Sequence, residues 1–226
     1  MIRFDNVSKR YLTGLDALAE VSFEIEAGEM VFVTGHSGAG KSTLLKLISL
    51  VERPTRGQIV VNHAELGRVR RRGIAHLRRG IGMVFQDHRL LMDRSVFDNV
   101  ALPLLIAGAA RDEIGKRVRA ALDKVGLLAR EKAHPLTLST GEQQRVGIAR
   151  AIVAKPPMII ADEPTGNLDP QLSLEIMGLF AEFGAVGTTV LVASHDLLLI
   201  KRLGKRALVL DHGRLVDDFR PQGKAP

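Results

Sequence analysis

Apolar residues follow two kinds of pattern along this chain. In the N-terminal part they alternate with polar residues at 2–4 and 21–25, which predicts antiparallel strands joined through a turn at 26–29. Continuous apolar runs follow at 30–34 and 81–86. A fully apolar run at 158–161 predicts a parallel strand buried on both faces.

Between residues 88 and 154 the apolar positions recur at helical spacing instead. The segment 111–125 predicts an amphipathic helix whose apolar face carries Ile114, Val118, Ala121, Leu122 and Val125. A second helix is predicted at 96–106, where we expect Pro103 to interrupt it, and a third at 141–154.

The other expected elements complete an α/β pattern. They are a helix at 42–50, a turn at 54–57, strands at 58–62 and 189–193, a helix at 172–183, and a hairpin of 206–210 with 214–216, before a frayed tail from Arg220. We therefore expect one domain over 1–226. Its α/β core with an antiparallel β subdomain comprises 1–87 and 155–217, its inserted helical subdomain 88–154, and its tail 218–226.

A phosphate-binding motif lies between the expected strand at 30–34 and the helix at 42–50. It fits the pattern G-x-x-x-x-G-K-[ST] and reads Gly35-His36-Ser37-Gly38-Ala39-Gly40-Lys41-Ser42-Thr43. Its glycines let successive backbone N–H groups point at one anion, and the start of the helix adds partial positive charge. Lys41 can reach the β- and γ-phosphates, and the Ser42 hydroxyl can bind Mg²⁺. The motif predicts nucleotide binding.

Composition narrows the class of protein. The chain has 226 residues, is 46% hydrophobic and contains no cysteine, which excludes disulfides and thiolate metal sites. No apolar run approaches the roughly 20 residues of a membrane span, and the N-terminus is not expected to be a signal peptide. A net charge of +7 suits an anionic partner. The basic cluster at 68–72 and 78–79 fits either a solvated helix or a surface that faces a membrane.

Two further groups of residues could carry chemistry. Asp162 and Glu163 end the apolar strand at 158–161, the edge of an α/β sheet where sites are found. There Asp162 would hold Mg²⁺ and Glu163 would act as the general base toward a water molecule. Within the predicted helical subdomain, Ser139 and Glu142 have the spacing of a helix capping box.

The segment Leu138-Ser139-Thr140-Gly141-Glu142-Gln143-Gln144-Arg145 resembles the signature motif of the ATP-binding cassette (ABC) family. Other motifs of the family then match segments of this chain, in the same order along the sequence. It implies adenine stacking for Tyr11, a Mg²⁺-sensing role for Gln86, a dimer-interface loop at Asn167-Leu168-Asp169 and a switch histidine at His195. The resemblance covers about 2–216, and it is strongest to the branch of the family that acts in bacterial cell division.

The resemblance implies a P-loop NTPase (RecA-like) core with the two subdomains described above. It implies ATP and Mg²⁺ as cofactors and a homodimer that forms on ATP binding. In that dimer, Lys41, Ser42, Asp162, Gln86, Glu163 and His195 act from one protomer. The residues that act in trans from the other protomer are Ser139, Thr140, Gly141 and Glu142.

A separate integral membrane subunit is also implied, with the chain bound peripherally at the cytoplasmic face of the plasma membrane. That subunit would insert a short helix near residues 86–104. The output would be a mechanical signal to cell-wall hydrolases. Alternatives are the ATPase of a lipoprotein or macrolide exporter, a DNA-repair or chromosome ATPase, and a scaffold that binds ATP without hydrolysis. No nucleic acid is expected, because the chain lacks the long coiled-coil or zinc insertions of such ATPases.

One residue departs from the family pattern. Thr140 stands where most members have the first signature glycine. A β-branched residue adds bulk near a phosphate and cannot easily adopt a positive φ. If the position is helical, the cost is small, and we expect that outcome.

Overall fold

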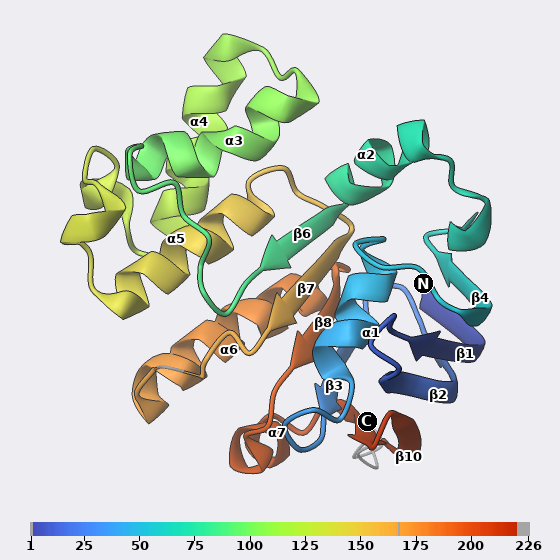
Figure 1. The fold of residues 1–226 in the computed structure, drawn as a ribbon. Helices are drawn as coiled ribbons and strands as arrows, with labels where there is room; N and C mark the ends of the chain where they lie inside the picture. The colour runs from blue at the N-terminus through green and yellow to red at the C-terminus, as the bar shows by residue number, and fades with distance from the viewer. Residues whose placement is uncertain (1, 167, 221–226) are drawn as a thin grey trace.

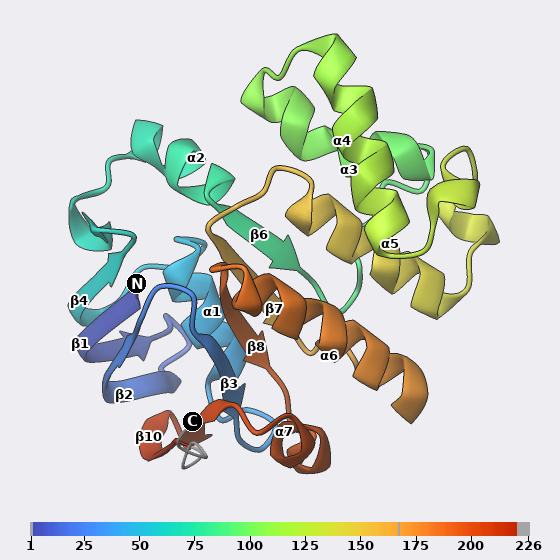
Figure 2. The same ribbon diagram turned by 180° about the vertical axis from the view of Figure 1, so that it is seen from behind.

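A six-stranded, mostly parallel sheet forms the centre of the molecule (Figures 1 and 2). The structure is a computed structural model that describes residues 2–166 and 168–220. The strand order is β10-β9-β3-β8-β7-β6, and only β10 runs antiparallel to its neighbour. The strands are β3 (Met30–Thr34), β6 (Ile81–Val84), β7 (Met158–Asp162), β8 (Thr189–Ala193), β9 (Arg206–Asp211) and β10 (Arg214–Phe219).

Each face of this sheet packs on a different apolar core, which explains the continuous apolar runs. Val31 and Val33 of β3 face a core that contains the buried leucines of α1 (Lys41–Ile48). Phe32, between them, faces the other core, which includes Phe180 of α6 (Pro170–Ala185). The short α7 (Leu197–Leu203) connects β8 to β9.

A separate antiparallel sheet covers the α1 side of the molecule. Its order is β2-β1-β4-β5, with bounds β1 (Ile2–Arg10), β2 (Asp16–Ile25), β4 (Arg56–Val61) and β5 (Ala64–Glu65). Alternate residues point into the core, as the sequence pattern predicts. Phe4 and Phe23 lie opposite each other on β1 and β2, and their rings stack with centroids 4.5 Å apart.

The helical subdomain comprises α3 (Val96–Ala107), α4 (Arg111–Lys124) and α5 (Thr140–Ile152). The expected interruption of α3 is wrong, because Pro103 lies inside a continuous helix. Proline removes one backbone donor, but Val96, Val100 and Leu104 are buried in the core and hold both halves of the helix in line. The helix expected at 141–154 begins at Thr140 instead, directly after its cap.

A short basic helix, α2 (Arg71–Arg79), precedes β6 and buries none of its residues. Its apolar face is narrow: only Ile74 and Leu77 are half-buried against the core beside α1, which is too few positions for helical periodicity to indicate the helix. Part of the basic cluster is structural, because Arg78 donates hydrogen bonds to the carbonyls of Ser49 and Leu50 at 3.0 and 2.9 Å. Three 3₁₀ turns complete the described elements, at Leu66–Arg68, Leu128–Arg130 and Pro135–Thr137.

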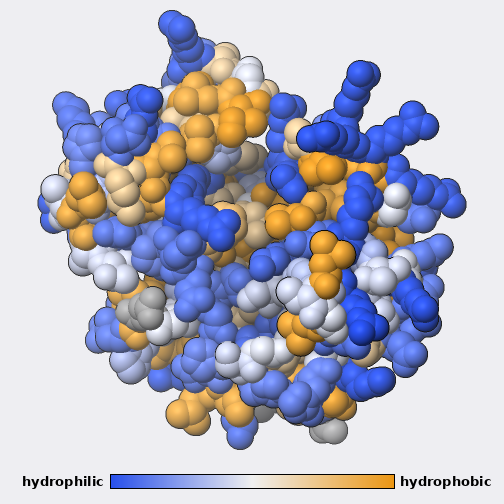
Figure 3. All heavy atoms as spheres, in the orientation of Figure 1, coloured by the Kyte–Doolittle hydropathy of each residue, from blue (hydrophilic) through white to orange (hydrophobic). Residues whose placement is uncertain are grey.

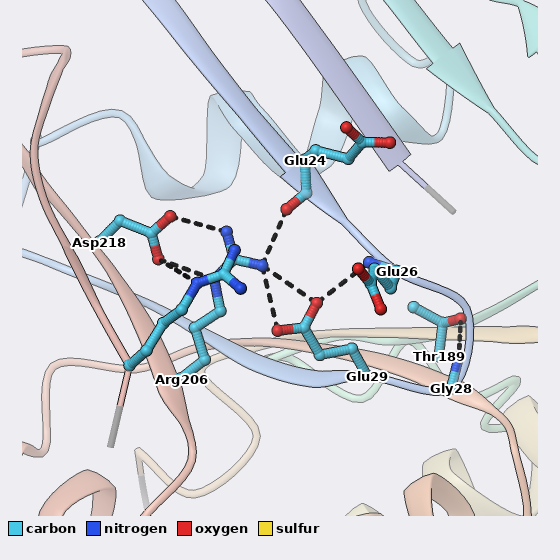
Figure 4. Close-up of polar contacts among 8 residues, drawn as sticks. Glu24, Glu26, Gly28, Glu29, Thr189, Arg206 and Asp218 are labelled. Carbon is cyan, nitrogen blue, oxygen red and sulfur yellow. Dashed lines mark hydrogen bonds and ion pairs between the residues drawn. The ribbon is translucent and has the colours of Figure 1, made fainter. Parts of the chain in front are cut away.

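A buried arginine ties the C-terminal hairpin to the turn between β2 and β3 (Figure 4). Arg206 donates two hydrogen bonds of 2.7 Å to the Asp218 carboxylate, and it also donates to Glu29 and to the backbone carbonyl of Glu24. These contacts neutralise a guanidinium that is only 5% exposed. Within the described residues, no helix has the length and apolar character needed to cross a membrane.

Candidate functional site

The phosphate loop forms the turn between β3 and α1, at the carboxyl edge of the central sheet. Two of its glycines are required by close backbone contacts. A Cβ atom on Gly35 would lie 2.1 Å from the carbonyl oxygen of Leu210, and one on Gly40 would lie 2.6 Å from that of Ala17. Both also adopt positive φ, at 148° and 106°. The loop can therefore follow this path only with glycine at these positions.

Lys41 lies back across the loop that precedes it. Its ammonium group donates hydrogen bonds to the carbonyls of Gly35 and His36 at 2.8 and 3.1 Å. It also forms an ion pair of 3.7 Å with Oε1 of Glu163. The Lys41 side chain is 9% exposed, so little solvent screens its positive charge at the mouth of the loop.

Ser42 and Asp162 meet beside the loop. The Ser42 hydroxyl donates a hydrogen bond of 3.1 Å to Oδ1 of Asp162, which ends strand β7. Burial raises the pKa of Asp162, and the hydrogen bond from Ser42 opposes that rise. A hydroxyl, a carboxylate and an amide oxygen are suitable ligands for Mg²⁺, and Gln86 brings such an amide to the same cleft. The residues therefore fit this metal.

Glu163 occupies a constrained backbone position. Its φ is 48°, a region that residues with side chains adopt at a cost. Its N–H donates to the carbonyl of Ala193 at 3.0 Å, and its own carbonyl accepts from the N–H of Gly166 at 3.2 Å. The carboxylate lies 2.7 Å from Nδ1 of His195, which follows β8. Together these contacts hold an acid–base pair at the edge of the cleft.

The cleft itself has a volume of about 620 Å³ and an open mouth. Tyr11 lies at one end, with its hydroxyl 3.3 Å from that of Thr43 and Lys9 4.9 Å from its ring centre. The residues that line the cleft are Tyr11, Leu15, Asp16, Ala17, His36, Ser37, Gly38, Gly40, Lys41, Ser42, Thr43, Gln86, Glu163 and His195. Ala39 of the loop is fully buried beneath it.

The signature residues lie apart from this cleft, at the start of α5 in the helical subdomain (Figure 1). Ser139 accepts a hydrogen bond from the N–H of Glu142, whose carboxylate accepts from the N–H of Ser139, so the predicted capping box is present. Thr140 is the first helical residue and Gly141 the second. Asp169 caps α6 through its Oδ1, and Asn167 lies outside the described residues.

The sequence patterns did not indicate some residues that line the cleft, nor the turn that packs beneath the phosphate loop. Leu15, Asp16 and Ala17 line the cleft, and their position a few residues after Tyr11 was the available signal. The turn between β9 and β10 supports the loop from below, since the N–H of Gly213 donates to the carbonyl of Ala39 at 3.1 Å. That contact joins residues far apart in sequence, so no local pattern indicates it.

The comparisons with known proteins agree with this geometry. The family described as ABC transporter matches residues 18–166, more than half of the chain. This chain belongs to the ABC transporter family. As an ABC cassette it binds ATP and is an ATPase.

Two curated relatives match this cassette over nearly its whole length. The cell division ATP-binding protein FtsE of Escherichia coli is 60% identical over 95% of this chain and 97% of its own length. The protein of the same name from Bacillus subtilis is 46% identical over 96% of both chains. The cassette is thus closely similar to the cell-division ATP-binding proteins of both bacteria.

Solved structures support the same assignment. The dimeric structure of MJ0796, a bacterial ABC transporter cassette, has a TM-score of 0.92 and 35% identity, and covers 99% of this chain and 100% of its own. A dimeric post-hydrolysis state of MJ0796 bound to ADP and Pi has a TM-score of 0.91 and 34% identity, with the same coverage. The fold expected from the sequence, an α/β P-loop core with two added subdomains, is confirmed.

Proposed function

We propose that this cassette is the ATPase subunit of a membrane complex of the FtsE–FtsX kind, which couples ATP hydrolysis to bacterial cell division. The observation that carries the proposal is the 60% identity to FtsE over 95% of the chain, together with one cleft that gathers phosphate-binding, metal-binding and base residues. The rival outputs, lipoprotein or macrolide export, would use the same cleft with another membrane subunit.

Within the cleft, each side chain has a role that its position allows. The loop from Gly35 to Thr43 would surround the phosphates of ATP, with Lys41 on the β- and γ-phosphates and Tyr11 against the adenine. Ser42, Asp162 and Gln86 would hold Mg²⁺, which neutralises phosphate charge when bound. These groups bind and orient the triphosphate.

Glu163 would accept the proton of the attacking water. The hydrogen bond from His195 orients one carboxylate oxygen and leaves the other toward Lys41. When a γ-phosphate draws Lys41 away, that second oxygen becomes available to the water. His195 lines the cleft beside Glu163 and would contact the γ-phosphate.

Completion of the site requires a second protomer. Ser139, Thr140, Gly141 and Glu142 form a capped helix start that lies away from the cleft of their own chain. A helix start binds anions through its free N–H groups, so a homodimer would place this one against the γ-phosphate of its partner. Asp169 would lie at the junction. The related MJ0796 cassette is described as dimeric.

The membrane subunit has a candidate docking groove. A groove of about 400 Å³ runs between α2, the edge strand β6 and the helices α3 and α5. Figure 3 shows an apolar hollow in this region, bordered by hydrophilic side chains, and Arg78, Arg79 and Arg150 are among the residues that line the groove. Phe85, Pro103 and Ile106 supply apolar surface, and Ile106 is 57% exposed. Such a groove suits a short amphipathic helix, so an FtsX-like subunit would hold the cassette at the cytoplasmic membrane face.

Purification of the cassette from native membranes tests this assignment. We expect an FtsX-like protein to co-purify, and recovery of an export permease instead would contradict the cell-division role. Ile106→Asp is expected to reduce that co-purification at least tenfold while the isolated cassette keeps its ATP binding. Val186→Asp, at a 79% exposed valine outside the groove, is the matched control.

A further inference from the structure

Three potential metal ligands meet below the phosphate loop. His36 belongs to the loop, Asp211 ends β9, and His212 follows in the β9–β10 turn. Nε2 of His36 lies 3.1 Å from Oδ1 of Asp211, and Nε2 of His212 lies 3.9 Å from the same oxygen. One ligand atom from each of the three residues lies within 4.8 Å of the others. All three side chains are accessible to solvent ions.

The neighbouring contacts prepare these atoms to bind a metal. Nδ1 of His36 lies 2.6 Å from the carbonyl oxygen of Ser37. A carbonyl oxygen can only accept, so Nδ1 donates to it, and Nε2 is the ring nitrogen that faces the Asp211 carboxylate. A metal ion would take the place of the proton between Nε2 and that carboxylate. A second hydrogen bond of this kind is what fixes the ring of a metal-bound histidine.

The two segments that supply the ligands are also joined through their backbones. The N–H of Gly213 donates to the carbonyl of Ala39 at 3.1 Å, and the carbonyl of Gly213 accepts from the N–H of Ala19 at 2.8 Å. The first bond fixes the turn that carries His212 against the loop that carries His36, and the second ties the same turn to strand β2. The ligands therefore need only side-chain rotation to converge on one ion.

We propose that His36, Asp211 and His212 bind a divalent transition metal ion such as Zn²⁺, which ties the phosphate loop to the β9–β10 turn. Tetrahedral Zn²⁺ with bonds of 2.0–2.2 Å separates neighbouring donors by about 3.4 Å. The distances of 3.1 and 3.9 Å lie on either side of that value. Two imidazoles and a carboxylate suit Zn²⁺, Co²⁺ or Ni²⁺ rather than Mg²⁺, and water would complete the site. This site is separate from the Mg²⁺ site at Ser42 and does not depend on the proposed function.

Metal titration of the nucleotide-free, untagged cassette tests the proposal. Calorimetry with ZnCl₂ is expected to show one equivalent per chain, and Co²⁺ is expected to give the visible absorption of a low-coordinate site. His212→Asn should weaken Zn²⁺ binding by more than about tenfold, because it removes a ligand. Asparagine tolerates the φ of 43° at this position, so the turn should be preserved.

His63→Asn is the matched control, because His63 is an exposed histidine with a φ of 65° in the β4–β5 turn. It should bind Zn²⁺ as the unmodified chain does. Zn²⁺ should raise the midpoint of thermal unfolding of the unmodified chain and of His63→Asn, but not of His212→Asn. Asp211→Asn removes a second ligand and should also lose binding. Unchanged Zn²⁺ affinity in both His212→Asn and Asp211→Asn would overturn the proposal.

Discussion

Nδ1 of His195 lies 2.7 Å from Oε2 of Glu163, while Nζ of Lys41 lies 3.7 Å from Oε1 of the same carboxylate. Each oxygen of the proposed general base therefore has a nitrogen beside it. The carboxylate is mostly buried, with a side chain 14% exposed, so these partners offset the cost of its desolvation. The residues that the reaction would use thus hold one another in place.

Glu163→Gln is expected to reduce ATP turnover by at least about 100-fold, because an amide cannot accept the proton of the attacking water. ATP binding should persist, since Lys41 retains its hydrogen bonds to Gly35 and His36. Phosphate release and binding of a fluorescent ATP analogue would measure the two effects. Turnover equal to that of the unmodified chain would support the non-hydrolysing scaffold.

Asp162→Asn tests the electrostatics of the metal-binding position. Burial raises the pKa of Asp162 in the folded chain, so ionisation of this carboxyl at neutral pH weakens folding. The protonated Asp162 carboxyl causes no such loss of stability below the ordinary pKa of aspartate, about 3.9. Stability is lost as the pH rises through the raised pKa of the folded chain and the carboxyl ionises. Asparagine stays neutral, so without nucleotide and Mg²⁺ the variant should unfold at a higher temperature than the parent at pH 7.

The advantage of Asp162→Asn should shrink as the pH is lowered toward 4. Asp93→Asn is a suitable control, since the Asp93 side chain is 78% exposed and should leave the unfolding temperature nearly unchanged. Differential scanning calorimetry at several pH values would measure both. A lower unfolding temperature for Asp162→Asn at pH 7 would mean that the carboxylate stabilises the fold.

Arg206→Ala should destabilise the chain by roughly 3 kcal/mol, because it leaves the Asp218 and Glu29 carboxylates without their cation. Arg206 also holds the pKa of Asp218 below its usual value through two hydrogen bonds. That contribution is present at neutral pH and is lost as the pH falls through the lowered pKa. Arg206→Ala should therefore unfold at a lower urea concentration, most clearly near neutral pH.

Arg214→Ala provides the comparison for Arg206. Arg214 pairs with Glu20 at 3.5 Å, and both side chains are more than 60% exposed. Solvent screens such a pair, so its removal should change the free energy of unfolding by less than about 1 kcal/mol. Equal effects of the two substitutions would show that the Arg206 network contributes no more than a surface ion pair.

The parts of the site that the sequence predicts are those encoded by short local patterns. The phosphate loop needs glycines at fixed spacing, and the capping box of Ser139 and Glu142 needs only three residues of separation. The ion pair of Lys41 with Glu163 could not be predicted in the same way. It depends on the parallel pairing of strands β3, β8 and β7, which brings distant segments to one edge.

The errors in the fold have the same origin. The propensity of Pro103 to end a helix is local, but burial of Val100 and Leu104 on both sides of it is a tertiary effect. The helix α2 was missed for the opposite reason. Its apolar face consists of only Ile74 and Leu77 among basic residues. The hydrogen bonds of Arg78 to the carbonyls of Ser49 and Leu50 depend on tertiary structure, so the sequence of the helix does not indicate them.

Thr140→Gly addresses the departure from the family signature. Thr140 is the first residue of α5 and is exposed, so its side chain neither disturbs the cap of Ser139 nor requires a positive φ. We therefore expect the substitution to change the ATPase rate by less than about tenfold, since glycine at such a position costs at most about 1 kcal/mol of helix stability. Gly141→Ala is the informative contrast, because its Cβ would lie 2.4 Å from Cδ2 of Leu172 and force that side chain to move. A rise of much more than tenfold in Thr140→Gly would mean that the native threonine partly disables the signature helix.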